Sequence, residues 1–154
     1  MKLVVLLLAA VCGNLACANA VSPDKEKDVA FLNSGAVLPT SLPFSEAVRA
    51  GNTLYLSGQI GIVPRSLTLV PGGIEAESRQ TMENIQSALA AHGYGMSDLV
   101  KCTVMLADMA EWQAFNAVYK TFFSETYPAR SAFATAGLAL GARVEVECIA
   151  WVDA

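Results

Sequence analysis

The segment RVEVECIAWV, residues 143–152, decides the fold, because its side chains alternate between two kinds. Small apolar residues occupy every second position: Val144, Val146, Cys148 and Ala150. Acidic and bulky apolar residues fill the positions between them: Glu145, Glu147, Ile149 and Trp151. A period of two predicts a β-strand with one buried face. The second face is too apolar for free solvation and too polar for a core, so we expect it to meet another subunit.

Helical periodicity marks two segments that precede this strand. In residues 75–92, Met82, Ile85 and Leu89 recur at spacings of three and four, which places them on one face of a helix. Residues 109–124 carry an apolar stripe at similar spacing: Trp112, Phe115, Tyr119 and Phe122. Both patterns predict amphipathic helices that pack on a sheet.

Shorter alternating runs predict the remaining strands. Residues 99–106 alternate, and the apolar side consists of Val100, Cys102, Val104 and Leu106. Residues 44–62 contain two short strands around a turn at 49–52, and another short strand ends near Thr135. The order β-β-α-β-α-β-β predicts one α+β domain in which two helices cover one face of a mixed sheet.

The first twenty residues have the plan of a secretory signal peptide, in which Lys2 precedes an apolar core and Ala20 marks the cleavage site. We therefore divide the chain into a signal peptide at 1–20, a lead-in at 21–40 and a domain at 41–154. Polar residues interrupt the apolar run before it reaches the ~20 residues of a membrane span. The cysteines of this segment lack the usual context of a lipidated residue. We expect an exported protein, periplasmic or extracellular, that is free of the membrane after cleavage.

The charge balance bears on possible partners. Removal of the signal peptide leaves nine of the ten basic residues and all fourteen acidic ones, a formal charge of −5. The cations are scattered rather than gathered in a patch that could neutralise phosphates, so we expect no nucleic-acid partner. The single histidine, His92, lies near a predicted helix end without other ligands at metal-binding spacing. We interpret it as a surface cap and expect no metal.

Two cysteines remain in the predicted domain. Cys102 and Cys148 both lie on the apolar face of a predicted strand. An exported protein could join them in a disulfide. Free cysteine also packs well as a small core residue, and we favour this second interpretation.

One cation differs from the others in its surroundings. Arg130 lies in TYPARSAFAT, residues 126–135, between a turn that contains proline and a run of small residues. We expect it to precede a strand next to the one that carries Glu145 and Glu147. An arginine and a carboxylate that meet at a subunit interface often form a structural ion pair. The alternative is a pocket in which Arg130 clamps a substrate carboxylate while a glutamate positions water or moves a proton.

Resemblance to a known family favours the pocket. The stretches LYLSGQIGI, FNAVYKTFF, YPARSAFAT and VEVECIAWV resemble, in order and spacing, motifs of the Rid family of reactive intermediate deaminases, also called the L-PSP endoribonuclease family. The resemblance runs from about Pro43 to Val152. It implies a chorismate-mutase-like fold and a homotrimer with three sites between subunits. It also implies hydrolysis of 2-imino acids, or of enamine tautomers such as 2-aminoacrylate, to 2-oxo acids and ammonia.

The resemblance assigns roles to seven residues. Arg130 matches the arginine that holds the substrate carboxylate, and Glu145 matches the glutamate associated with the hydrolytic water. Five further positions match residues of the substrate pocket: Phe44, Ser57, Gly58, Asn116 and Ala132. Phe44 stands where archetypal members have a tyrosine. The missing hydroxyl predicts an altered substrate range or rate.

The implied chemistry needs no cofactor. An iminium carbon is already electrophilic, so the protein mainly has to hold the acid and place a water molecule. The alternative is a non-catalytic trimer that binds a small carboxylate in the same cleft, which Phe44 and export away from cytoplasmic imines would favour. Ribonuclease activity, suggested by the family's second name, conflicts with the acidic charge and the scattered cations.

Overall fold

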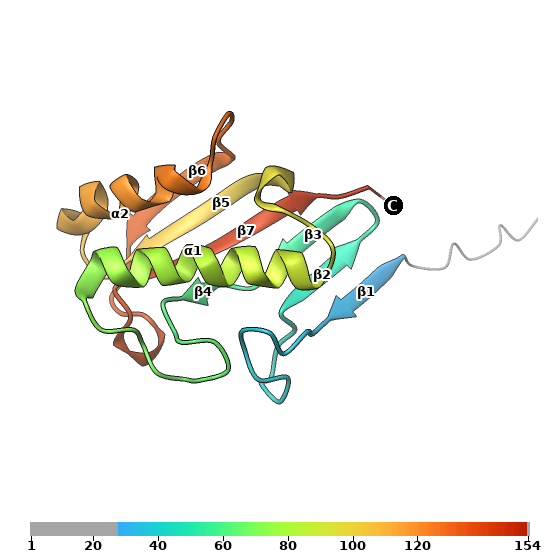
Figure 1. Ribbon diagram of the computed structural model, residues 1–154, viewed down its shortest axis with the longest axis horizontal. Coiled ribbons are helices and arrows are strands. Elements are labelled where there is room, and N and C mark those ends of the chain that lie inside the picture. Colours follow the sequence, from blue (N-terminus) through green and yellow to red (C-terminus); the bar gives the residue numbers. More distant parts are fainter. Residues whose placement is uncertain (1–27, 154) are drawn as a thin grey trace, which may run out of the picture.

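The computed structural model of the protein describes residues 28–153. The predicted signal peptide at 1–20 lies outside the described residues, as does the first part of the lead-in. The strands are β1 (Val29–Leu32), β2 (Ala47–Ala50), β3 (Thr53–Leu56), β4 (Gln59–Ile60), β5 (Leu99–Leu106), β6 (Ala129–Ala134) and β7 (Val144–Trp151). The α-helices are α1 (Gly73–Ala91) and α2 (Trp112–Tyr119) (Figure 1). Short 3-10 turns at Met109–Glu111 and Lys120–Phe122 extend α2 at both ends.

The strands form one mixed sheet with the order β1-β2-β3-β7-β5-β6, and β4 also pairs with β7. Only β5 and β6 run parallel among these pairs. Both helices lie against the same face of the sheet, with α1 across its middle and α2 above β5 and β6 (Figure 1). The predicted α+β fold with two helices on one face is therefore confirmed.

The core lies between this face and the helices. The predicted inward face of β7 is confirmed, because Val144, Val146, Cys148 and Ala150 are all buried. Met82, Ile85 and Leu89 of α1 meet them in one apolar cluster, which Phe115 of α2 joins. Burial of this apolar surface is the main force that holds helices and sheet together. None of the helices in residues 28–153 has the length and apolarity needed to cross a membrane.

Two features of the sheet differ from the sequence prediction. No strand is predicted within the lead-in, but β1 lies there and pairs antiparallel with β2. In β5, the pairing with β7 shifts register between Leu99 and Lys101. Because an irregularity of this kind reverses the facing of the residues beyond it, Leu99 is buried and Val100 is 48% exposed. The prediction that Val100 faces the core is wrong.

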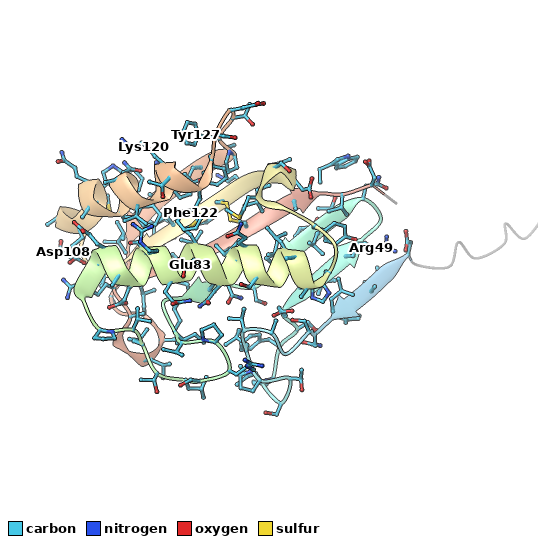
Figure 2. The ribbon with its side chains drawn as sticks, in the orientation of Figure 1. Arg49, Glu83, Asp108, Lys120, Phe122 and Tyr127 are labelled. Carbon is cyan, nitrogen blue, oxygen red and sulfur yellow. A yellow bond between two sulfur atoms is a disulfide. The ribbon has the colours of Figure 1, made fainter. Side chains whose placement is uncertain are left out.

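The expectation of two free thiols is also wrong. Cys102 of β5 and Cys148 of β7 lie directly opposite each other in the ladder and form a disulfide (the yellow bond in Figure 2). The sequence shows that both residues face the core, but it does not show that antiparallel pairing brings them into register. The bond joins two neighbouring strands in the centre of the sheet and closes a loop across 46 positions of sequence.

We predict that the disulfide stabilises the fold. Changing both Cys102 and Cys148 to alanine should lower the free energy of unfolding by up to about 4 kcal/mol, since a loop of this length is then unconstrained in the unfolded chain. Urea unfolding with and without a reductant measures the effect. The reductant should lower the free energy of unfolding of the parent protein and leave that of the double variant unchanged. Detection of free thiols at Cys102 and Cys148 in the unfolded, unreduced parent would contradict the prediction.

Candidate active site

The predicted site residues fall into two separate groups. The arginine half-site contains Arg130 of β6 and Asn116 of α2, which line a cavity of about 420 Å³. The other residues that line this cavity are Tyr119, Lys120, Tyr127 and Pro128. Figure 2 shows Lys120 and Tyr127 near each other where α2 ends and β6 begins. The cavity thus lies at the edge of the sheet, where β6 has a neighbouring strand on one side only.

The Arg130 side chain is packed against aromatic rings. Its guanidinium carbon lies 4.4 Å from the centre of the Tyr119 ring and 4.6 Å from that of Trp112. Phe115 is farther away, at 5.9 Å. Within residues 28–153 no carboxylate forms an ion pair with Arg130, and its buried Nη1 has no hydrogen-bond partner. The cation is therefore held without being neutralised, which leaves its charge available to an anion.

The glutamate half-site contains four of the other predicted site residues. Phe44, Ser57, Gly58 and Glu145 line a cavity of about 210 Å³, and Phe44, Gly58 and Glu145 also border an adjoining apolar one of about 310 Å³. Phe44 precedes β2, Ser57 and Gly58 connect β3 to β4, and Glu145 lies on β7. The structure thus brings these four residues together.

Gly58 leaves the space that the carboxylate of Glu145 occupies in this structure. A Cβ atom built on Gly58 would lie 2.1 Å from Glu145 Oε1, which is far shorter than any allowed contact. The backbone and the carboxylate can pack this closely only because residue 58 has no side chain. A larger residue at position 58 would therefore displace the carboxylate of Glu145 from its present position.

Hydrogen bonds hold the loop that carries Phe44. The Ser57 hydroxyl donates to the carbonyl of Ser45 at 2.7 Å, and the Ser57 N–H donates to the carbonyl of Glu46 at 3.0 Å. The buried Glu46 carboxylate in turn lies 2.9 Å from Nε2 of His92 at the end of α1. His92 is the C-cap of α1, as its place near a helix end predicts, but its side chain is largely buried against Glu46 rather than at the surface.

Strand β4, which pairs with β7 beside Glu145, is hydrogen-bonded to α1. The side-chain amide of the buried Asn84 donates to the carbonyls of Ile60 and Ile62, at 3.0 and 2.9 Å. These bonds hold β4 against α1 and so fix the segment that follows Gly58. Sequence reasoning missed this residue, because its polar side chain falls on the same buried helix face as the apolar ones.

The Glu145 carboxyl is only partly solvated. Burial raises its pKa above the ordinary value, and the like charge of Glu147 on the same strand raises the pKa further. A glutamate with a raised pKa exchanges protons closer to neutral pH than an exposed one. Its position in a small cavity therefore suits a group that takes and returns a proton.

The two half-sites do not meet within one chain. Arg130 pairs with Cys102 and faces the helices, whereas Glu145 pairs with Met105, three residues further along β5, and faces the open side of the sheet. Strand β5 also lies between β6 and β7. The prediction that Arg130 lies next to the strand of Glu145 is therefore wrong, because β5 separates β6 from β7, whereas their meeting between subunits stays a prediction.

Other positions add little to either half-site. Ala132 shares the helix-facing side of β6 with Arg130, but it packs against the core and does not line the cavity. A further hollow of about 520 Å³, bordered by Asp98 and Trp151, contains none of the predicted site residues. In the described part of the chain no three side chains of His, Cys, Asp or Glu gather as a metal site would require.

Sequence reasoning assigned the aromatic stripe of α2 to the core alone. Trp112 and Tyr119 belong to that stripe, and both contact Arg130 as well. Spacing identified the helix face on which they lie. It could not reveal that the parallel pairing of β6 with β5 brings an arginine under that face.

The chain has relatives among known proteins. Residues 35–152 match the family described as Endoribonuclease L-PSP. A 2-iminobutanoate/2-iminopropanoate deaminase of Mus musculus is 45% identical over 108 residues, which cover 70% of this chain and 80% of that protein. Among solved structures, RidA from the Antarctic bacterium Psychrobacter sp. PAMC 21119 is 35% identical. Its TM-score is 0.75, with coverage of 80% of this chain and 99% of that chain.

A second solved structure was determined with a ligand. E. coli TdcF with bound serine is 29% identical, with a TM-score of 0.74 and coverage of 80% of this chain and 99% of that chain. The family match spans both half-sites, from before Phe44 to beyond Glu145. The protein therefore belongs to the Endoribonuclease L-PSP family, which includes the Rid deaminases.

Proposed function

We propose that the protein hydrolyses 2-imino acids, or their enamine tautomers, to 2-oxo acids and ammonia without a cofactor. The observation that carries the proposal is an unpaired arginine, Arg130, on the wall of a cavity that no carboxylate lines. Such a cation is suited to an organic acid of small size. The curated relatives named 2-iminobutanoate/2-iminopropanoate deaminase support the choice of reaction.

The reaction follows from the chemistry of the two half-sites. Arg130 holds the substrate carboxylate, which fixes the imine carbon in one position. The Glu145 carboxylate takes a proton from a water molecule as the water oxygen bonds to that carbon, and a carbinolamine forms. Glu145 then returns this proton to the amine, the carbon–nitrogen bond breaks, and the carbinolamine hydroxyl gives its own proton to the leaving ammonia as it becomes the carbonyl of the 2-oxo acid. One water is consumed and one ammonia is released.

The reaction requires that a second copy of the chain complete the site. The open face of the sheet exposes several large apolar side chains, with Phe31 at 71% and Trp151 at 58%. Such a surface is typical of one that meets another subunit. We propose a homotrimer in which the open face of one subunit brings its glutamate half-site to the arginine half-site of the next. Phe44 then contributes a ring to the shared cleft but no hydrogen bond.

Export of the protein is a further part of the proposal. The segment at 1–20 has the pattern of a signal peptide, and the domain contains the disulfide between Cys102 and Cys148. Disulfides persist in oxidising compartments and are rare in the cytosol. Both observations support a periplasmic or extracellular protein.

Imine hydrolysis should depend on Arg130. An amino-acid oxidase generates the imino acid in place, and ammonia release is followed with and without the protein. Arg130→Ala and Arg130→Lys should each lower the rate by at least about 100-fold, because the substrate is no longer held in register with the water. Subunit assembly, measured by light scattering, should be unchanged. Binding of a carboxylate without any turnover by the parent would instead identify a non-catalytic binder.

Mixing of inactive variants tests whether the site is shared. Arg130→Ala and Glu145→Gln should each be inactive alone. Trimers assembled from an equal mixture should regain roughly a quarter of the parent activity, since some clefts then receive both intact residues from different subunits. If mixed trimers form and remain inactive, the two half-sites do not combine across subunits.

The acid limb of the pH profile should depend on Glu147. Glu145 acts as a base in its ionised form, so kcat/KM should fall as the pH drops through its raised pKa. Glu147→Gln removes the like charge, lowers the pKa of Glu145 and should move this limb to lower pH. Glu83→Gln, an equal charge change on the exposed side of α1, should leave the limb in place. A limb that does not move would show that Glu145 is not the titrating group.

The proposed export can be checked by mass spectrometry. When the full chain is produced in a bacterium with a periplasm, the mature protein should begin at Val21 and be found in the periplasmic fraction. It should contain no free thiol, because the only other cysteines are Cys12 and Cys17 of the removed segment. Recovery of the uncleaved chain from the cytosol would contradict the proposed export.

A further inference from the structure

An aromatic cluster surrounds the guanidinium of Arg130. The rings of Trp112, Phe115 and Tyr119 follow one another along one face of α2, with centres 6.0 and 5.5 Å apart. Arg130 enters from β6 beneath this face and lies within 4.6 Å of the centres of the Trp112 and Tyr119 rings. Helix and strand are thus connected by a cation and two rings.

The aromatic rings that contact the Arg130 cation are uncharged. Burial raises the pKa of Tyr119, and this effect outweighs the opposite effect of the neighbouring Arg130 cation. The phenol therefore stays neutral, and the cation meets the electron-rich face of a ring rather than a phenolate. A carboxylate in the same place would hold the arginine as firmly, but it would cancel the charge that a substrate carboxylate needs.

We propose that Trp112 and Tyr119 are positioning residues, which together form an aromatic clamp that holds the Arg130 guanidinium in place for the substrate carboxylate while leaving its charge intact. The inference rests on the proposed function, in which Arg130 binds that carboxylate. It assigns the ring faces, not the Tyr119 hydroxyl, to the task. The buried hydroxyl has no hydrogen-bond partner among the described residues.

Loss of one ring should weaken binding of carboxylates selectively. The probes are 2-oxobutanoate, a product of the proposed reaction class, and its uncharged methyl ester, and calorimetry measures their affinities for the full protein. Trp112→Leu should lower the affinity for 2-oxobutanoate about 10-fold, because a desolvated cation–π contact is lost. Its affinity for the ester should change less than about 2-fold. Trp112→Phe and Tyr119→Phe keep a ring and should retain most of the affinity for the acid.

A matched control separates the clamp from general packing. Phe122, labelled in Figure 2, also packs on the core near the end of α2 but makes no cation–π contact with Arg130. Phe122→Leu should therefore leave the ratio of the two affinities unchanged. Equal losses for acid and ester in Trp112→Leu, or a loss in Trp112→Phe as large as in Trp112→Leu, would overturn the clamp.

The binding assay does not depend on turnover. A parent protein that hydrolyses imines through Arg130, combined with an unchanged acid-to-ester ratio in Trp112→Leu, would refute the clamp alone. A parent that hydrolyses no imine, combined with a selective loss of acid binding in Trp112→Leu, would refute the proposed reaction and support the clamp.

Discussion

The pleat of the sheet is the constraint on which the candidate site depends. Side chains along a strand alternate between two faces, so a residue's register decides whether it meets the helices or the open side. Arg130 is in register with Cys102 and Glu145 with Met105, and these two positions of β5 have opposite facing. No side-chain rotation within one chain can bring the guanidinium and the carboxylate together. The proposed reaction, in which both residues act, therefore needs the guanidinium and the carboxylate to come from different copies of the chain.

The parts of the fold that follow from periodicity could be predicted from the sequence. Strand β7, the face of α1 and the aromatic face of α2 each repeat a pattern over many residues, and the structure agrees with all three. Strand β1 was not predicted, because its residues VAFL are all apolar and show no alternation, and its pairing depends on β2. The facing of Val100 was missed for a related reason, since a single register shift leaves no mark in the local sequence.

The candidate site was predicted residue by residue but not as an arrangement. Motifs identified Arg130 and Asn116 at one cavity and Phe44, Ser57, Gly58 and Glu145 at the other, but not the remaining residues that line the cavity of Arg130. Three contacts between distant segments were not predicted from the sequence: the disulfide, the pairing of Glu46 with His92, and the packing of Arg130 against Trp112. Each depends on which strands are neighbours, and hydrophobic patterns carry little information on that order.

The charges of the two half-sites complement each other. Arg130 and Lys120 line one cavity without a carboxylate, whereas Glu145 lies beside Glu147 without a cation among the residues lining its own two cavities. In the proposed assembly, each half-site would bring the charge that the other lacks, and this attraction would favour the orientation that the reaction needs. If the two residues instead formed a direct ion pair, the pair would occupy the anion site itself. The aromatic clamp offers a physical reason why that need not happen, because rings can hold the guanidinium back from the glutamate until a substrate carboxylate takes its place beside the cation.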